Sequence, residues 1–209
     1  MSLVHACDVQ PVAQLHPEAV DSILAGYAFH PYRHWKGFGR GVPRQLLRWE
    51  LFADASQVSS QCWLANDRHG PCGIAVVAPS AWESEQLGAR IVNIRHLVAM
   101  GDTVQRQEVA TALLEAVKQR IQPDGMTCLV HRLDSSDYPT MKALEAQGFH
   151  LVDTSISFIR GPEFRPFLRR TFRRAPAIRT YEEKDWPAVE AIARQSHFGG
   201  RFYHDPHFS

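Results

Sequence analysis

Two adjacent stretches decide the fold: RIVNIRHLV at residues 90–98 and VQRQEVATALLEAVKQRI at residues 104–121. In the first, apolar and polar residues largely alternate, which is typical of a β-strand with one buried face. In the second, apolar residues recur at helical spacing, at Val109, Ala110, Leu113, Leu114 and Val117. The two stretches predict a strand followed directly by an amphipathic helix.

The residues before this pair predict two helices and a hairpin. Residues 17–28 have apolar groups at helical spacing and a proline in the first turn, and residues 43–55 repeat the pattern. Residues 61–65 and 73–78 are short apolar runs joined by a turn-rich tip, as in a β-hairpin.

The residues after the pair alternate between strand and helix. A buried-type strand is predicted at residues 127–131, and a short helix at residues 139–147 closed by Gly148. A last long strand is predicted at residues 149–159. Strands that first follow one another and then alternate with helices indicate an α/β (α+β) fold, with a mixed sheet and flanking helices.

Composition argues against several classes of partner. The chain has 209 residues, with 23 Lys and Arg against 22 Asp and Glu, for a formal net charge of +1. Without a strong positive field we expect no nucleic-acid partner. Without a long apolar run or a secretion signal, we expect no membrane partner and a cytoplasmic location.

Cysteine and histidine spacing gives no sign of a metal site. The four cysteines are Cys7, Cys62, Cys72 and Cys128, and none forms a CxxC pair. The eleven histidines are scattered along the chain. We therefore expect no metal and reduced thiols.

The C-terminal part has a different composition. Residues 160–179 are rich in arginine and proline, which favours a solvated linker over a nucleic-acid patch because no regular helical face is present. Residues 177–181 look like a strand, and Asp185 can cap a helix at residues 186–195. With no sheet sequence after that helix, we expect a fragment of a longer domain.

Short motifs in this order resemble the GNAT family of N-acetyltransferases. Residues 79–88 (PSAWESEQLG) are similar to the Trp-Asp-Ser-x-x-Phe-Gly signature of enzymes that acetylate dTDP-linked amino sugars, with Glu83 and Leu87 replacing Asp and Phe. Residues 108–114 occupy the slot where family members read Gly-Ile-Gly-x-Ala-Leu-Leu. Residues 141–151 look like the helix-Gly-Phe-strand ending of the fold.

The resemblance also implies a domain organisation. Residues 178–189 look like the first strand and helix of a second GNAT domain. The implied parts are a GNAT-like domain at 1–163, a basic linker at 164–176 and the truncated start of a second GNAT-like domain at 177–209. Acetyl-CoA is the implied cofactor, and a small-molecule amine is the implied acceptor. Whether the protein forms a homodimer is an open question at this point.

GNAT enzymes hold acetyl-CoA with the backbone of one strand and with amides at the start of the next helix. The implied cofactor-binding residues are Val98, Met100, Gln105, Arg106, Gln107, Val109 and Ala110. Glu108 stands where the central glycine of the family belongs, and its carboxylate would repel a pyrophosphate. We therefore expect weak or no acetyl-CoA binding by this domain. We also expect the Glu108 carboxylate to fold back and cap the helix itself.

The family's usual proton donor is a tyrosine on the helix before Gly-Phe, and Leu144 occupies that position here. The implied catalytic candidates are instead Tyr138, at the helix start, and Asp134, in the loop beyond strand 127–131. His131 is a further candidate base. A packed aromatic, a capping aspartate and a strand-end histidine are the plainer interpretations of these three residues.

Three hypotheses follow. The first is an acetyl-CoA-dependent N-acetyltransferase of the amino-sugar type, with this portion degenerate and activity residing chiefly in the second unit. The second is a non-catalytic binding or scaffold domain, which Glu108 and Leu144 favour. The third is another acyl-CoA-dependent transferase that holds mainly the pantetheine arm. The loop at residues 30–41, where Arg33 and two histidines stand among aromatic residues, is the implied acceptor-side loop.

Overall fold

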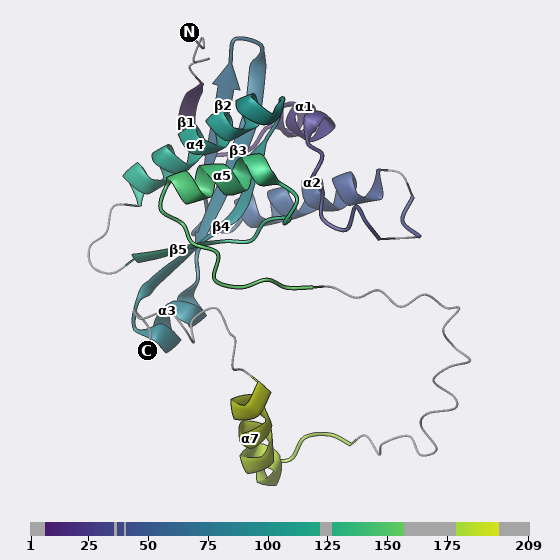
Figure 1. The fold of residues 1–209 in the computed structure, drawn as a ribbon, viewed down its shortest axis with the longest axis vertical. Coiled ribbons are helices and arrows are strands. Elements are labelled where there is room, and N and C mark those ends of the chain that lie inside the picture. The colour runs from purple at the N-terminus through teal and green to yellow at the C-terminus, as the bar shows by residue number, and fades with distance from the viewer. Residues whose placement is uncertain (1–6, 36, 40, 122–126, 157–178, 197–209) are drawn as a thin grey trace. The chain divides into compact units, whose positions relative to one another are not determined.

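The computed structural model describes residues 7–35, 37–39, 41–121, 127–156 and 179–196 (Figure 1). The chain divides into two compact units, Met1–His150 and Leu151–Ser209.

The first unit is built on a five-stranded mixed sheet. Its strands lie in the order of the sequence: β1 (Asp8–Val12), β2 (Gln61–Asp67), β3 (Gly70–Pro79), β4 (Arg90–Ala99) and β5 (Thr127–His131). The first four strands pair antiparallel, and β5 pairs parallel with β4. A parallel pair needs a long crossover, and the helix after β4 supplies it.

Helices cover both faces of this sheet, and each face has its own core (Figure 1). The helices of the first unit are α1 (Pro17–Gly26), α2 (Val42–Ala55), α3 (Ala81–Leu87), α4 (Thr103–Arg120) and α5 (Tyr138–Ala146). The core under α1 and α2 joins Ile23 and Leu51 to Ile74, whereas the core under α4 and α5 joins Leu113 to Ile94. The predicted fold class, a mixed sheet with flanking helices, is confirmed.

Within the described residues, the sheet opens beyond the end of β5. The β4–β5 register runs from Arg90 opposite Thr127 to Ile94 opposite His131, where β5 ends. Beyond it, residues 95–99 of β4 continue alongside β3, and no described strand pairs with their other edge. The β3–β4 register shifts at the same level, so Arg95 is an extra residue on β4.

The prediction of a last strand at residues 149–159 is wrong for the residues that the structure describes. Residues 149–156 form no strand, and Leu151 and Ile156 are 78% and 72% exposed. A strand is stable only beside a partner that satisfies its backbone groups, and no described strand pairs with these residues. Residues 157–159 lie outside the described residues.

The described part of the second unit comprises residues 151–156, which form no strand, and a short helical segment within residues 179–196. A 3-10 turn, η2 (Glu183–Asp185), leads into α7 (Trp186–Ser196), which confirms the predicted helix. The Asp185 carboxylate accepts the backbone N–H of Glu182 at 2.9 Å and pairs with Arg179. Residues 179–181 are not a strand, contrary to prediction, and the predicted linker at 164–176 lies outside the described residues.

Among the described residues, no helix is both long enough and apolar enough to cross a membrane.

Candidate functional site

The start of α4 is closed by its own sequence. Asp102 is the N-cap residue, and its Oδ1 accepts the backbone N–H groups of Val104 and Gln105, each at 2.9 Å. The Gln105 side chain reaches back and accepts the Asp102 backbone N–H at 3.1 Å, which completes a capping box. The expectation that Glu108 caps this helix is therefore wrong, because the capping carboxylate is that of Asp102.

This cap bears on the predicted phosphate-binding turn. The amides free of intrahelical bonds at a helix start are the first four. In α4 these are the amides of residues 102–105: those of Val104 and Gln105 bond to the Asp102 side chain, and that of Asp102 bonds to Gln105 Oε1 at 3.1 Å. Glu108 lies one turn further in. Three amides that would face a pyrophosphate thus already have internal partners.

The other predicted cofactor residues have mixed surroundings. Val109 and Ala110 are buried in the core under α4 and α5, and Val98 is buried in the core on the opposite face. The Met100 amide donates to the Cys72 carbonyl at 2.9 Å. Gln107 is exposed. Their role toward acetyl-CoA stays a prediction.

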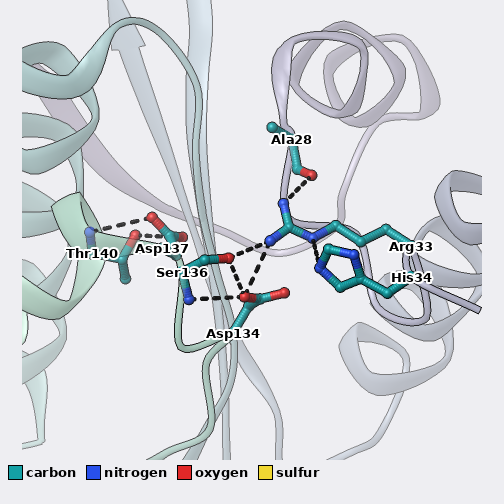
Figure 2. Close-up of polar contacts among 7 residues, drawn as sticks. All are labelled: Ala28, Arg33, His34, Asp134, Ser136, Asp137 and Thr140. Atoms are coloured by element: carbon teal, nitrogen blue, oxygen red, sulfur yellow. Dashed lines mark hydrogen bonds and ion pairs between the residues drawn. The ribbon is translucent and has the colours of Figure 1, made fainter.

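Arg33 joins two loops of the first unit (Figure 2). It lies between α1 and α2, and its Nη2 donates to Asp134 Oδ1 at 3.2 Å and to the Ser136 hydroxyl, both in the loop between β5 and α5. Its Nη1 donates to the Ala28 carbonyl and its Nε to His34 Nε2, each at 3.0 Å. One guanidinium therefore connects the loop between α1 and α2 to the loop that carries Asp134.

Asp134 is held as an anion. Burial acts to raise its pKa, but hydrogen bonds from Ser136 and the positive charge of Arg33 outweigh burial and leave the pKa below its usual value. A carboxylate with a lowered pKa holds a proton poorly at neutral pH, so it is a weak general base. It is well suited to pair with a cation.

Tyr138 and Leu144, both on α5, have different environments. Tyr138 is the first residue of the helix and 63% exposed, and its hydroxyl forms no hydrogen bond with the described residues. Leu144 is 5% exposed and belongs to the core. The structure does not bring Tyr138 into contact with Asp134. The helix is capped by Asp137, which accepts the Thr140 hydroxyl at 2.9 Å.

Aromatic and cationic groups surround the Arg33 network. The guanidinium carbons of Arg33 and Arg106 lie 4.6 and 4.9 Å from the Phe29 ring centroid. Tyr27 is half-buried nearby, and burial, reinforced by the charges of Asp137 and Asp134, raises its pKa. Of the predicted cofactor residues, Arg106 thus faces this cluster.

Two histidines, His96 and His131, lie near the point where β5 ends. One of them forms a pair with an aspartate that the sequence did not indicate. The His96 Nε2 lies 2.8 Å from Asp54 Oδ2, and burial lowers the His96 pKa despite that partner. His131 Nδ1 lies 2.8 Å from the Ile94 carbonyl, and burial lowers its pKa to about 4. No local motif could have paired His96 with Asp54, which is 42 residues away.

Residues 79–88, which resemble a family signature in sequence, help to connect α3 to β4. Ser84 donates to the Ser80 carbonyl at 2.6 Å and accepts the Ile91 backbone N–H at 2.9 Å, which ties α3 to β4. Gly88 ends α3 with a φ of +61°, a left-handed conformation that suits glycine. Among the described residues, no group of three or more His, Cys, Asp or Glu side chains is arranged to hold a metal ion.

Comparisons with known proteins bear on the fold. No protein-family model matches this sequence, and no curated protein is significantly similar to it. Solved structures do match. A transcriptional regulator from Bacillus halodurans has a TM-score of 0.51 and 11% identity, over 74% of this chain and all of its own.

Two further structures are acetyltransferases. A ribosomal-protein-alanine N-acetyltransferase from Brucella melitensis has a TM-score of 0.49 and 18% identity, over 75% of this chain and 100% of its own. An aminoglycoside 6'-N-acetyltransferase from Acinetobacter baumannii has a TM-score of 0.46 and 13% identity, over 75% of this chain and 99% of its own. At these identities, what the chain shares with known structures is the fold.

Proposed function

We propose that this chain is an N-acetyltransferase-family protein of the GNAT fold that acts on a small amine, such as an amino sugar. Its first unit, in this proposal, binds acetyl-CoA weakly or not at all. The N-acetyltransferases with a similar arrangement of strands and helices support the family, and the signature-like residues 79–88 support the amino-sugar class.

The observation that carries the cofactor half of the proposal is the closed start of α4. A helix start binds a pyrophosphate through free amides and the positive end of its dipole. Here the Asp102 carboxylate occupies two of those amides and adds a negative charge beside them. Glu108 adds a second carboxylate one turn away. Both carboxylates therefore oppose the binding of a pyrophosphate at the start of α4.

Calorimetric titration with acetyl-CoA tests this half directly. We expect no saturation in the low micromolar range, and a tight, stoichiometric isotherm would contradict the proposal. The double variant Asp102→Ala with Glu108→Gly should bind acetyl-CoA measurably better, because two amides become free and two negative charges are lost. Glu115→Gly is the matched control, since it weakens α4 and leaves the helix start unchanged. If the double variant gains no affinity, the cofactor site differs from its relatives at more than these positions.

A second candidate is a non-catalytic binding or scaffold unit. Leu144, buried where the family carries its proton-donating tyrosine, favours it. The two candidates separate in an acetyl-transfer assay with a panel of primary amines at millimolar acetyl-CoA. Turnover supports the enzyme, whereas amine binding without turnover supports the binding unit.

A further inference from the structure

The Asp134 carboxylate uses only one of its two oxygens (Figure 2). Oδ1 accepts from Arg33 Nη2 at 3.2 Å, from the Ser136 backbone N–H at 2.9 Å and from the Ser136 hydroxyl at 2.5 Å. Among the described residues no hydrogen-bond donor reaches Oδ2, which lies in Figure 2 on the side of the carboxyl group away from Ser136. The side chain is 25% exposed. An oxygen without a hydrogen-bond donor can accept an N–H group of a ligand.

The groups around Asp134 suit a cation. The carboxylate is ionised at neutral pH, and the Ser136 hydroxyl oxygen beside it already accepts one N–H. Arg33 donates from Nη2 to Asp134 Oδ1 and to the Ser136 hydroxyl oxygen at once. A protonated primary amine carries the same kind of donor on one nitrogen, in a smaller group. The place that Nη2 occupies is therefore one that an ammonium group could take.

We propose that Arg33 is an internal stand-in for the ammonium group of the acceptor. In the free protein its guanidinium occupies a cation site formed by Asp134 and Ser136, and a protonated primary amine takes that place when it binds. The inference rests on the proposed function, which supplies the small amine, and it adds a specific binding site and a self-blocking contact.

The backbone next to Arg33 favours such an exchange. Tyr32 has a φ of +63°, a left-handed conformation that is rare for a bulky residue and therefore strained. The adjacent Arg33 is anchored across to Asp134, so the ion pair helps to hold the loop in this conformation. Displacing the guanidinium allows the loop to relax. Amine binding would thus be coupled to movement of the exposed rings of Tyr32 and Trp35.

An NMR titration tests the exchange with glucosamine, galactosamine and kanamycin as amine probes. N-acetylglucosamine is the uncharged control probe, because it lacks the ammonium group of glucosamine. Arg33→Gln should tighten glucosamine binding by up to about fivefold, the range expected when a partly exposed competing charge is removed. Asp134→Asn should abolish binding or weaken it by at least a similar factor. Arg48→Gln, which breaks the ion pair with Asp21 between α1 and α2, is the matched control and should bind as the wild type does.

The outcomes distinguish a failure of the Arg33 inference from a failure of the proposed function. If glucosamine binding in Asp134→Asn equals that of the wild type, or if Arg33→Gln weakens binding as Asp134→Asn does, the stand-in is overturned while the proposed function stands. If neither the wild type nor Arg33→Gln binds any probe amine, the amine part of the proposed function fails, and the inference fails with it. Should Asp134→Asn not fold, Ser136→Ala replaces it: weaker glucosamine binding is expected, and unchanged binding overturns the inference.

Discussion

Acid should destabilise the first unit through His131. Its Nδ1 is bonded to the Ile94 carbonyl, and burial holds its pKa at about 4. An unfolded histidine has a pKa of about 6.5. Because the folded pKa is the lower one, the unfolded chain takes up the proton first. The stabilisation is therefore complete above about pH 6.5 and is lost as the pH falls toward about pH 4.

The magnitude follows from these two pKa values. At about pH 5 the unfolded ring is mostly protonated, whereas the folded ring is mostly neutral. The difference in proton binding lowers the free energy of unfolding by about 2 kcal/mol relative to about pH 7.5. Burial also lowers the pKa of His96 and His30, so both add to the loss in the same direction.

A single variant isolates the contribution of His131. His131→Gln keeps an N–H donor for the Ile94 carbonyl and removes the titrating ring. Urea unfolding followed by circular dichroism should show that the wild type loses about 2 kcal/mol more than this variant between about pH 7.5 and pH 5. His69→Gln, in the exposed turn between β2 and β3, should behave as the wild type does. If His131→Gln loses as much stability as the wild type, the lowered pKa of the His131 ring is refuted.

Three further changes test the structure. Asp102→Ala should lower the free energy of unfolding by about 1 kcal/mol through loss of the α4 cap, and an unchanged melting temperature would contradict the capping box. Gly73→Ala would place a Cβ 2.5 Å from Val109 Cγ1, so it should cost about 1–3 kcal/mol, read as a lower urea midpoint; a wild-type midpoint would argue against this close contact. Asp54→Asn should lower the His96 pKa further, because the carboxylate acts to raise it; an imidazole NMR titration that shows no change would refute the pair.

Sequence periodicity was a good guide to the elements that lie against a core. Residues 104–121 carry an apolar face, and α4 occupies Thr103–Arg120. The strand predicted at 149–159 had no such support, because its residues mix apolar and polar groups on both faces. A strand also depends on a neighbour, which local sequence does not specify.

The site was harder to predict because its contacts are distant in sequence. Arg33 and Asp134 are 101 residues apart, and nothing near either residue indicates the other. The cap of α4 was within reach, since Asp102 and Gln105 have the spacing of a capping box. The alignment with a family motif drew attention to Glu108 instead, one turn too far along the helix.

The opening of the sheet beyond Ile94 has a consequence for solubility. An unpaired strand edge can add a strand from another molecule, and proteins guard such edges with charges and bulges. Here the extra residue in β4 is the exposed Arg95, at the level where β5 ends. The bulge interrupts the regular spacing of backbone groups, and the guanidinium makes close stacking of a second copy unfavourable. Where the described residues leave the β4 edge without a partner strand, we expect Arg95 to oppose pairing with a second copy.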